Sequence, residues 1–388
     1  MDAGQTARRS VLSLELGVSL EVGVWNLELV AWALNFSKNS HGPTLVLPVV
    51  IRKEWWMRSF ANVAIHPSQF PENLRRDLLT SLRARQLNHK FLYDGLKQTR
   101  KWLALHDAFS PARNDIDCLE TYDKAFVAAA ERATARRVHV ISLGCGGGQK
   151  DIPLLRRLRQ RGKQVGYAPC DVSVAMVLTA RQAALEILDS KDCFPLVCDL
   201  LTSDDLAGAL RQQSPADAAR LVTFFGLIPN FEPAVIMPLL AGLLQPDDVL
   251  LLSANLAPGS DHAAGVQRIL SLYDNALTRD WLMTFLLDLG VEQDDGELVF
   301  AVQDAPGGTG LKRVVANFHF RRSRKVQVFT DEVHFQAEER LRLFFSYRHT
   351  PDQVTALLGR YGLAAAGQWI SRSEQEGVFL CARREQTR

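Results

Sequence analysis

The chain has 388 residues, enough for two domains or for one large α/β domain with an appendage. Hydrophobic residues make up 47% and charged residues 23%, a composition that excludes a disordered chain. Lys and Arg total 45 against 43 Asp and Glu, and the net charge of +2 gives no general attraction to nucleic acid or to an anionic membrane. We therefore expect neither as a partner.

The cysteine pattern and the N-terminus bear on the compartment. Six cysteines are scattered, with no C-x-x-C pair and no histidine at zinc-finger spacing, so we expect reduced thiols and no metal site. An apolar run at residues 12–30 follows two arginines, but three glutamates interrupt it. The run fits neither a signal peptide nor a membrane span, and we expect a cytoplasmic protein.

Residues 1 to about 60 carry the weakest signals. Trp55, Trp56 and Phe60 form an apolar cluster that indicates core packing more than a binding platform. We interpret residues 1–85 as an accessory region that forms an extra layer, a lid or a dimer surface, so a homodimer is one option. Apolar spacing predicts helical structure within 71–105 and a further helix over 116–134.

A strand, a tight turn and a helix follow one another in the middle of the chain. A β-branched run over 138–143 breaks into glycines, and an amphipathic stretch follows. Glycine permits positive φ and a close approach of the backbone to a ligand. Gly144, Gly146 and Gly148 give G-x-G-x-G, which differs from the dinucleotide fingerprint G-x-G-x-x-G. The loop predicts a site for a dinucleotide or for S-adenosylmethionine, with a purely structural turn as the alternative.

Short apolar runs then alternate with helical stretches. The runs that we interpret as strands cover 165–170, 194–198, 221–225 and 249–253. This alternation predicts a parallel, doubly wound sheet with ligands at the carboxyl ends of its strands. Asp171 stands at one such end, about 20 residues beyond the glycine loop, where a carboxylate accepts from both ribose hydroxyls. Asp199 ends the next strand and is placed to accept from an adenine amino group, although an isolated Asp after a strand is usually a cap or turn residue.

The alternation stops beyond Pro258. The elements predicted from there on are a helix over 265–289, strands over 313–320 and 325–329, a helix over 352–360 and a closing strand over 377–382. Basic side chains gather beside the two middle strands, at Arg321, Arg322, Arg324 and Lys325. We interpret this basic cluster as a solvated hairpin tip and not as an anion site.

Together these segments resemble the histidine-specific methyltransferases, whose type member trimethylates the α-amine of histidine. The likeness runs from about Lys90 to the C-terminus. Residues 143–150 are similar to the family's L-G-S-G-(T/S)-(S/G)-E-K loop, and 167–173 and 198–200 to its second and third strand signatures. The resemblance implies S-adenosylmethionine as the cofactor. The cofactor-binding residues that it implies are Gly144, Gly146, Gly148, Lys150, Asp171, Asp199, Leu200 and Phe225.

The likeness extends to the family's substrate contacts. The similar segments are 90–94 to K-[WYF]-[FL]-Y-D, 225–231 to G-S-T-I-G-N-[FL], 273–275 to Y-D-D, and 346–351 to the end of E-x-S-[CY]-[KR]-[FY]-[TR]-P. The resemblance implies that Tyr93, Asn230 and Tyr273 are the catalytic, substrate-holding residues and that Ser346 contacts the substrate. We expect the first three to orient an α-amino-carboxylate without a formal charge.

One departure from the family pattern concerns the acceptor. The family glutamate that holds the imidazole, two places before the serine, is Phe344 here. A phenylalanine cannot accept a hydrogen bond from an imidazole N–H, so discrimination for histidine should be lost. A methionine of the type member is replaced by Ala316, which we expect to open space. We therefore place Phe344 in the substrate site, in a pocket that has become apolar and roomier.

The predicted fold class is α/β, a doubly wound Rossmann-like methyltransferase sheet with a second, α+β substrate-binding domain built from N- and C-terminal segments. We assign 1–85 to the accessory region, 86–135 and 259–388 to the substrate domain, and 136–258 to the cofactor domain. The expected function is N-methylation of the α-amine of a free amino acid or derivative with an apolar or aromatic side chain. The alternatives are a histidine methyltransferase, a methyltransferase of another small-molecule acceptor, and a non-catalytic cofactor-binding subunit.

Overall fold

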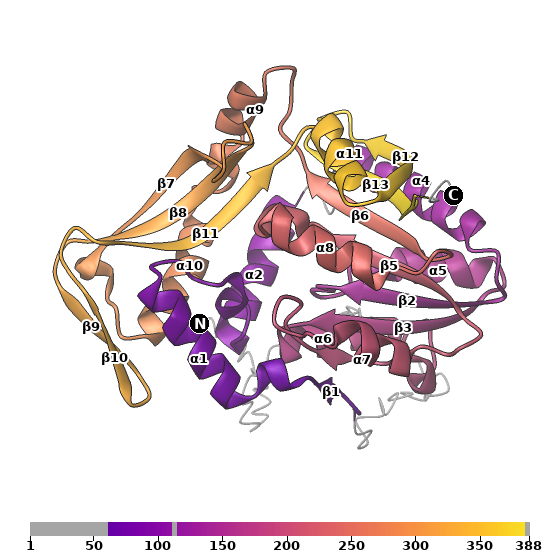
Figure 1. Cartoon of the computed structure of the whole chain (residues 1–388), viewed down its shortest axis with the longest axis horizontal. Coiled ribbons are helices and arrows are strands. Elements are labelled where there is room, and N and C mark those ends of the chain that lie inside the picture. Colours follow the sequence, from indigo (N-terminus) through magenta and orange to yellow (C-terminus); the bar gives the residue numbers. More distant parts are fainter. Residues whose placement is uncertain (1–60, 111–114, 385–388) are drawn as a thin grey trace, which may run out of the picture. The chain divides into compact units, whose positions relative to one another are not determined.

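The computed structural model describes residues 61–110 and 115–384, which lie within one compact unit formed by Phe60–Arg388 (Figure 1). The predicted cluster of Trp55, Trp56 and Phe60 lies outside the described residues. No helix of the described part is both long and apolar enough to cross a bilayer. The same part contains no group of His, Cys, Asp and Glu side chains that could hold a metal ion.

An eight-stranded, mostly parallel sheet is the largest sheet of the described residues (Figure 1). In spatial order its strands are β1 (Ala64–Ile65), β4 (Leu196–Val197), β3 (Gln164–Asp171), β2 (Arg137–Leu143), β5 (Ala219–Phe225), β6 (Val249–Asn255), β13 (Glu376–Arg383) and β12 (Leu363–Ile370). Only β13 runs against its neighbours. The strand order reverses between β2 and β5, the point where such sheets bind ligands. The predicted doubly wound sheet is confirmed.

Helices bury both faces of this sheet, which explains the continuous apolar runs of its strands. Along β2, Val138 and Val140 face one core while Ile141 and Leu143 face the other. The first core is closed by α4 (Ile116–Arg132) and α5 (Asp151–Gln160), and the second by α7 (Leu206–Gln213), α8 (Pro233–Leu243) and α11 (Pro351–Arg360). The helix α6 (Val174–Ala184) packs on β3.

A smaller antiparallel sheet supports the second part of the fold. Its strands are β7 (Gly296–Asp304), β8 (Lys312–Phe320) and β11 (Arg340–Arg348), and a hairpin of β9 (Arg324–Val328) and β10 (Asp331–Phe335) extends it. A third core joins this sheet to α1 (Pro71–Arg83), to the short helix η2 (His89–Leu92) and to α10 (Ala276–Asp288). The helix α2 (Leu96–Phe109) packs against α10.

Both ends of the described chain return to the large sheet. Residues 363–383, which we assigned to the substrate domain, form β12 and β13; β13 pairs with β6, and β12 pairs with β13. Residues 64–65, assigned to the accessory region, pair with β4. Those two predicted boundaries are therefore wrong, because strand pairing over long sequence separations joins segments whose local patterns differ.

Two further local predictions need correction. The predicted helix over 265–289 is interrupted between α9 (His262–Arg268) and α10, because the Asn275 side chain accepts from the Thr278 N–H and begins a new helix. The predicted solvated basic tip is instead anchored, since Arg322 and Arg324 both donate to the fully buried carboxylate of Asp295.

Two buried histidines link folding to pH. His139 on β2 and His349 after β11 are fully buried, and neither ring nitrogen of either finds a partner among the described residues. Burial, with Arg220 as a second cause, lowers the pKa of His139 to about 4. Burial, with His262 as a second cause, lowers the pKa of His349 to about 4. Both rings are therefore neutral in the folded protein.

Folding stability should fall as the pH drops below 6.5. The unfolded chain binds a proton at each histidine with a pKa of about 6.5. The stability from these two rings is fully present above that pH and is lost down to pH 4, by up to about 1.4 kcal/mol per pH unit for each. Urea unfolding between pH 7.5 and 5 measures this slope. His139→Gln should make it shallower, and an unchanged slope in a folded variant would contradict the assignment.

Candidate active site

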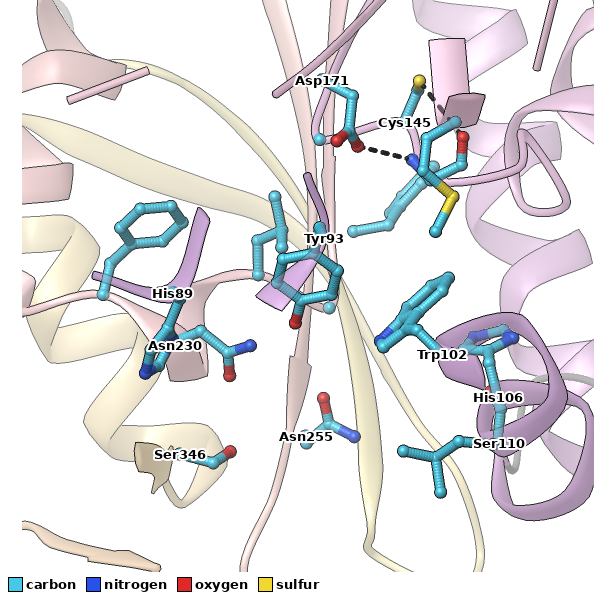
Figure 2. A pocket seen from close by; sticks show the side chains of 18 of the residues that line it. His89, Tyr93, Trp102, His106, Ser110, Cys145, Asp171, Asn230, Asn255 and Ser346 are labelled. Carbon is cyan, nitrogen blue, oxygen red and sulfur yellow. Dashed lines mark hydrogen bonds between the residues drawn. The ribbon is translucent and has the colours of Figure 1, made fainter. Parts of the chain in front are cut away.

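A cavity of about 320 Å³ lies at the carboxyl ends of β2 to β6 (Figure 2). This volume is within the range of small-molecule sites. The cavity brings together nearly all the residues that the sequence singled out. Those in its wall are Tyr93, Gly144, Gly146, Lys150, Asp171, Asp199, Leu200, Phe225, Asn230, Tyr273, Phe344 and Ser346. Gly148 is the exception, since it is not among the lining residues.

The glycine loop needs its glycines for two different reasons. Gly144, Gly146 and Gly148 all have positive φ, at 67°, 51° and 78°. A Cβ on Gly144 would lie 1.9 Å from a terminal carbon of Leu227, which also lines the cavity. A Cβ on Gly148 would lie 3.1 Å from the backbone of Ala180 in α6. Gly144 and Gly146 therefore shape the cavity, whereas Gly148 permits helix packing behind it.

Asp171 ties the end of β3 to this loop (Figure 2). Its Oδ2 accepts from the Gly146 N–H at 3.0 Å, and its Oδ1 accepts from the Ser173 N–H at 3.0 Å. Burial raises the pKa of Asp171, and these backbone donors oppose the rise. Each carboxylate oxygen has a second lone pair, so capacity to accept from a ligand remains.

Asp199 forms a buried ion pair that the sequence did not indicate. Its Oδ2 lies 2.9 Å from the ammonium of Lys90, which is also 2.6 Å from Asp77. The Lys90 side chain is only 3% exposed. Asp199 Oδ1 accepts from the Leu201 N–H. The pair holds the segment before Tyr93 against the end of β4.

Lys150 also has protein partners. Its ammonium donates to the Tyr122 hydroxyl at 2.5 Å and to the buried Glu376 carboxylate at 3.2 Å. Phe225 packs edge-on against the ring of Tyr122. Lys150 therefore neutralises a carboxylate of β13, and its third N–H is left for a ligand in the cavity.

Tyr93 and Asn230 meet in the middle of the cavity (Figure 2). Tyr93 follows η2, and Asn230 ends the short helix η4 (Ile228–Asn230). The Asn230 carboxamide lies near the Tyr93 hydroxyl (Figure 2). Burial raises the pKa of Tyr93 well above its ordinary value, and the Asp171 charge adds to the rise. The phenol therefore keeps its proton.

Tyr273 stands in a chain of polar contacts. Its hydroxyl is 2.8 Å from Ser346 Oγ and accepts from Nε and Nη2 of Arg348 at 3.0 and 2.8 Å. Arg348 Nη1 donates to the Leu256 carbonyl at 3.2 Å. The sequence prediction of a grip without a formal charge did not include this guanidinium, which lies beside Tyr273 in the cavity wall. Arg348 could have been found from its spacing, since alternate residues of a strand share a face with Ser346.

Aromatic rings form the wall around Phe344. Its ring stacks on His89 at 5.1 Å and lies 6.0 Å from the rings of both Trp281 and Tyr273. Ala316 is paired directly with Phe344 across the strands but is fully buried and does not line the cavity. The expectation that Ala316 opens space in the pocket is therefore wrong.

Two further lining residues escaped prediction from the sequence. His89 Nε2 accepts from the Phe345 N–H at 3.1 Å, and burial together with the charges of Arg342 and Arg313 lowers the pKa of His89 to about 3. Trp102 packs over Gly146 and lies 5.8 Å from the Tyr93 ring. The helical spacing of Trp102, Leu105, His106 and Phe109 on α2 could have indicated a shared face.

A comparison with family models identifies the family of this chain. The model of the family described as histidine-specific, SAM-dependent methyltransferases matches residues 74–383. The chain belongs to this family. It is therefore an S-adenosylmethionine-dependent methyltransferase.

The individual proteins that this chain resembles have low sequence identity to it. The chain is 26% identical over 283 residues to the N-methyltransferase imqF of Aspergillus flavus, covering 70% of this methyltransferase and 73% of that one. It is 14% identical to the magnesium protoporphyrin IX methyltransferase of Synechocystis, over 75% and 96% of the two chains, with a TM-score of 0.42. It is 16% identical to the sugar N-methyltransferase KedS8 of Streptoalloteichus, over 72% and 93%, with a TM-score of 0.34.

Alanine at Gly144 should weaken cofactor binding in this methyltransferase. The new methyl group meets Leu227 and also forces a left-handed φ on a non-glycine residue. Gly162→Ala is the matched control, because Gly162 has φ 73° and a methyl group there would meet nothing within 4 Å. Calorimetry with S-adenosylhomocysteine should show a loss of about tenfold or more, or about 1.4 kcal/mol, only for Gly144→Ala. Equal affinities in both variants would contradict this account.

Proposed function

We propose that this methyltransferase methylates the α-amine of a free amino acid or derivative whose side chain is apolar or aromatic. The observation that carries the proposal is the convergence of Tyr93, Asn230 and Tyr273 on a cavity whose wall holds Phe344 where the family has a carboxylate. The name of the Aspergillus flavus relative, an N-methyltransferase, supports nitrogen as the acceptor atom. Histidine, another small-molecule acceptor and a non-catalytic role are the competing outcomes of the experiment below.

The cofactor end of the cavity fits S-adenosylmethionine. The loop of Gly144 and Gly146 brings bare backbone to the end of β2, and Asp171 keeps free lone pairs for ribose hydroxyls. We assign the adenine end to Asp199 and Leu200, and a contact of the amino-acid tail to Lys150. The cofactor supplies a methyl group on a positively charged sulfur.

The aromatic wall disfavours histidine as the acceptor. An imidazole N–H directed at Phe344 would lose its hydrogen bond to water and gain no acceptor. The neighbouring His89 is neutral and already uses its Nε2 lone pair on the backbone, so it offers no acceptor there either. An apolar or aromatic side chain gains contact with Phe344 and Trp281 at no such cost.

The polar groups then position the amine for transfer. A neutral amine attacks the methyl carbon in line with the departing sulfur, so most of the rate enhancement comes from holding the nitrogen about 3 Å from that carbon. Asn230 aims the nitrogen, and Tyr93 remains a protonated donor because burial raises its pKa. The amine has to lose its proton first, to solvent or through water beside a tyrosine.

We also propose a cytoplasmic location. All six cysteines are buried free thiols, and this suits a reducing compartment.

Mass spectrometry of a mixed amino-acid pool incubated with the protein and S-adenosylmethionine tests the function. We expect mass gains of about 14, 28 or 42 Da, one per methyl group, on an apolar or aromatic amino acid. Methylated histidine alone would establish the first alternative. No methylated amino acid, with cofactor binding intact in calorimetry, would favour another acceptor or a non-catalytic role.

Phe344→Glu should shift preference toward histidine. The new carboxylate can accept from an imidazole N–H and is costly to bury beside an apolar side chain. The ratio of kcat/KM for histidine to that for the preferred apolar acceptor should rise by about 100-fold. Phe344→Leu is the control and should leave this ratio low. An unchanged ratio in both variants would show that Phe344 does not contact the acceptor side chain.

Tyr93→Phe should weaken the binding of the acceptor more than the binding of the cofactor. The hydroxyl is lost while the ring still packs on Trp281 and Trp102. We expect KM for the acceptor to rise about tenfold, equivalent to one hydrogen bond of about 1.4 kcal/mol, with little change in S-adenosylhomocysteine affinity. Tyr273→Phe should act in the same direction. Equal losses for both ligands would indicate damage to the fold.

A further inference from the structure

Arg348 carries a buried positive charge that has only neutral partners. The residue is 4% exposed, and its guanidinium donates to the Tyr273 hydroxyl and to the Leu256 carbonyl. Within residues 61–110 and 115–384, no Asp or Glu forms an ion pair with it. Arg313 on the adjacent strand, which is similarly buried, pairs with Glu232 at 3.0 Å. Burying an ion costs several kcal/mol unless an opposite charge compensates it.

The unpaired guanidinium lies in the wall of the active-site cavity. Phe344, Ser346 and Arg348 are alternate residues of β11, and all three line the cavity. Along this strand, an aromatic ring, a hydroxyl group and a guanidinium thus face the cavity one after another. Nε, Nη1 and Nη2 of Arg348 each donate once to the protein, which leaves two of the five guanidinium N–H groups.

The hydrogen-bond directions around Tyr273 follow from this arrangement. Two Arg348 N–H groups occupy both lone pairs of the Tyr273 oxygen, so its own proton must go to Ser346 Oγ. The Ser346 hydroxyl proton is then free to point to a ligand. Tyr273 is therefore a positioning residue that links the cation to a serine donor.

We propose that Arg348 is the counter-ion of a carboxylate on the acceptor, with Ser346 as a second donor to it. The inference rests on the proposed function and narrows it, because the acceptor must then be a free acid. A carboxylate compensates the buried charge and can engage the two remaining N–H groups. An ester, an amide or an amine without the carboxyl group leaves the cation unpaired.

This requirement also fixes the order of reactions. The step that supplies the acceptor must leave its carboxyl group free. Any step that esterifies, amidates or removes that group must come after methylation.

Acceptor analogues test the proposal on the wild-type protein. The probes are L-tryptophan and L-phenylalanine, each with its methyl ester, its amide and its decarboxylated amine. We expect kcat/KM for the free acid to exceed that for each analogue by at least about 100-fold, or about 2.7 kcal/mol. If acid and ester react equally, the proposed function stands and this inference fails. If neither free acid reacts while the ester or the amide does, this inference fails and the proposed function is limited to amino-acid derivatives. If only the decarboxylated amine reacts, the proposed function fails as well.

Variants separate a charge contact from a structural role. Arg348→Met should reduce the acid-to-ester ratio of kcat/KM to near one, and Arg348→Lys should keep much of it. Arg279→Met is the matched control, because Arg279 also donates to a backbone carbonyl but pairs with Asp274 and does not line the cavity. If kcat/KM for the acid and for the ester fall together and their ratio stays constant, Arg348 only supports the fold. Thermal unfolding of each variant confirms that it is folded.

Discussion

The buried ion pair between Lys90 and Asp199 holds the two parts of the site together. Lys90 begins the segment that ends in Tyr93, and Asp199 follows β4 of the large sheet. Removing one partner of such a pair costs about 3–5 kcal/mol, because the other charge remains buried. A second carboxylate, Asp77 from α1, shares the ammonium. Two neighbouring segments and a third that lies 109 residues further along the chain are thus fixed around one nitrogen, and Tyr93 enters the cavity from this point.

The same logic of charge compensation separates the cofactor end from the acceptor end. Lys90 and Lys150 are both matched by carboxylates, Asp199 and Glu376 among them. Arg348, at the other end of the cavity, is matched by none of the described residues. Arg181 is also buried and donates to a neutral group, Ser190 Oγ, but it does not line the cavity. Arg348 lines the cavity, so a ligand can compensate its charge there.

The predictable parts of the molecule are those with a local signal. The strands β2, β3, β5 and β6 are buried on both faces and appear in the sequence as apolar runs. The strand β12 escaped prediction because three alanines and a glycine follow its first residue, Leu363, and these residue types have low strand propensity. β1 has only two residues, and only its partner β4 makes it a strand.

The site residues divide in the same way. His89, Trp102 and Arg348 become site residues only because distant segments pack together. The Phe345 N–H donates to His89 Nε2 and so fixes the tautomer of the ring. The Tyr273 hydroxyl, 75 residues away in the sequence, accepts from Arg348 and so orients its guanidinium.

The open cation also bears on how the amine loses its proton. An amino acid is a neutral zwitterion while its amine is protonated, and it carries one negative charge once the amine is neutral. A site whose acceptor end holds an uncompensated guanidinium, with Phe344 where the family has a carboxylate, favours the second form. On the proposed assignment, Arg348 therefore lowers the pKa of the bound amine without touching it. The protein can then dispense with a dedicated base, because the charge that recognises the carboxylate also selects the reactive form of the amine.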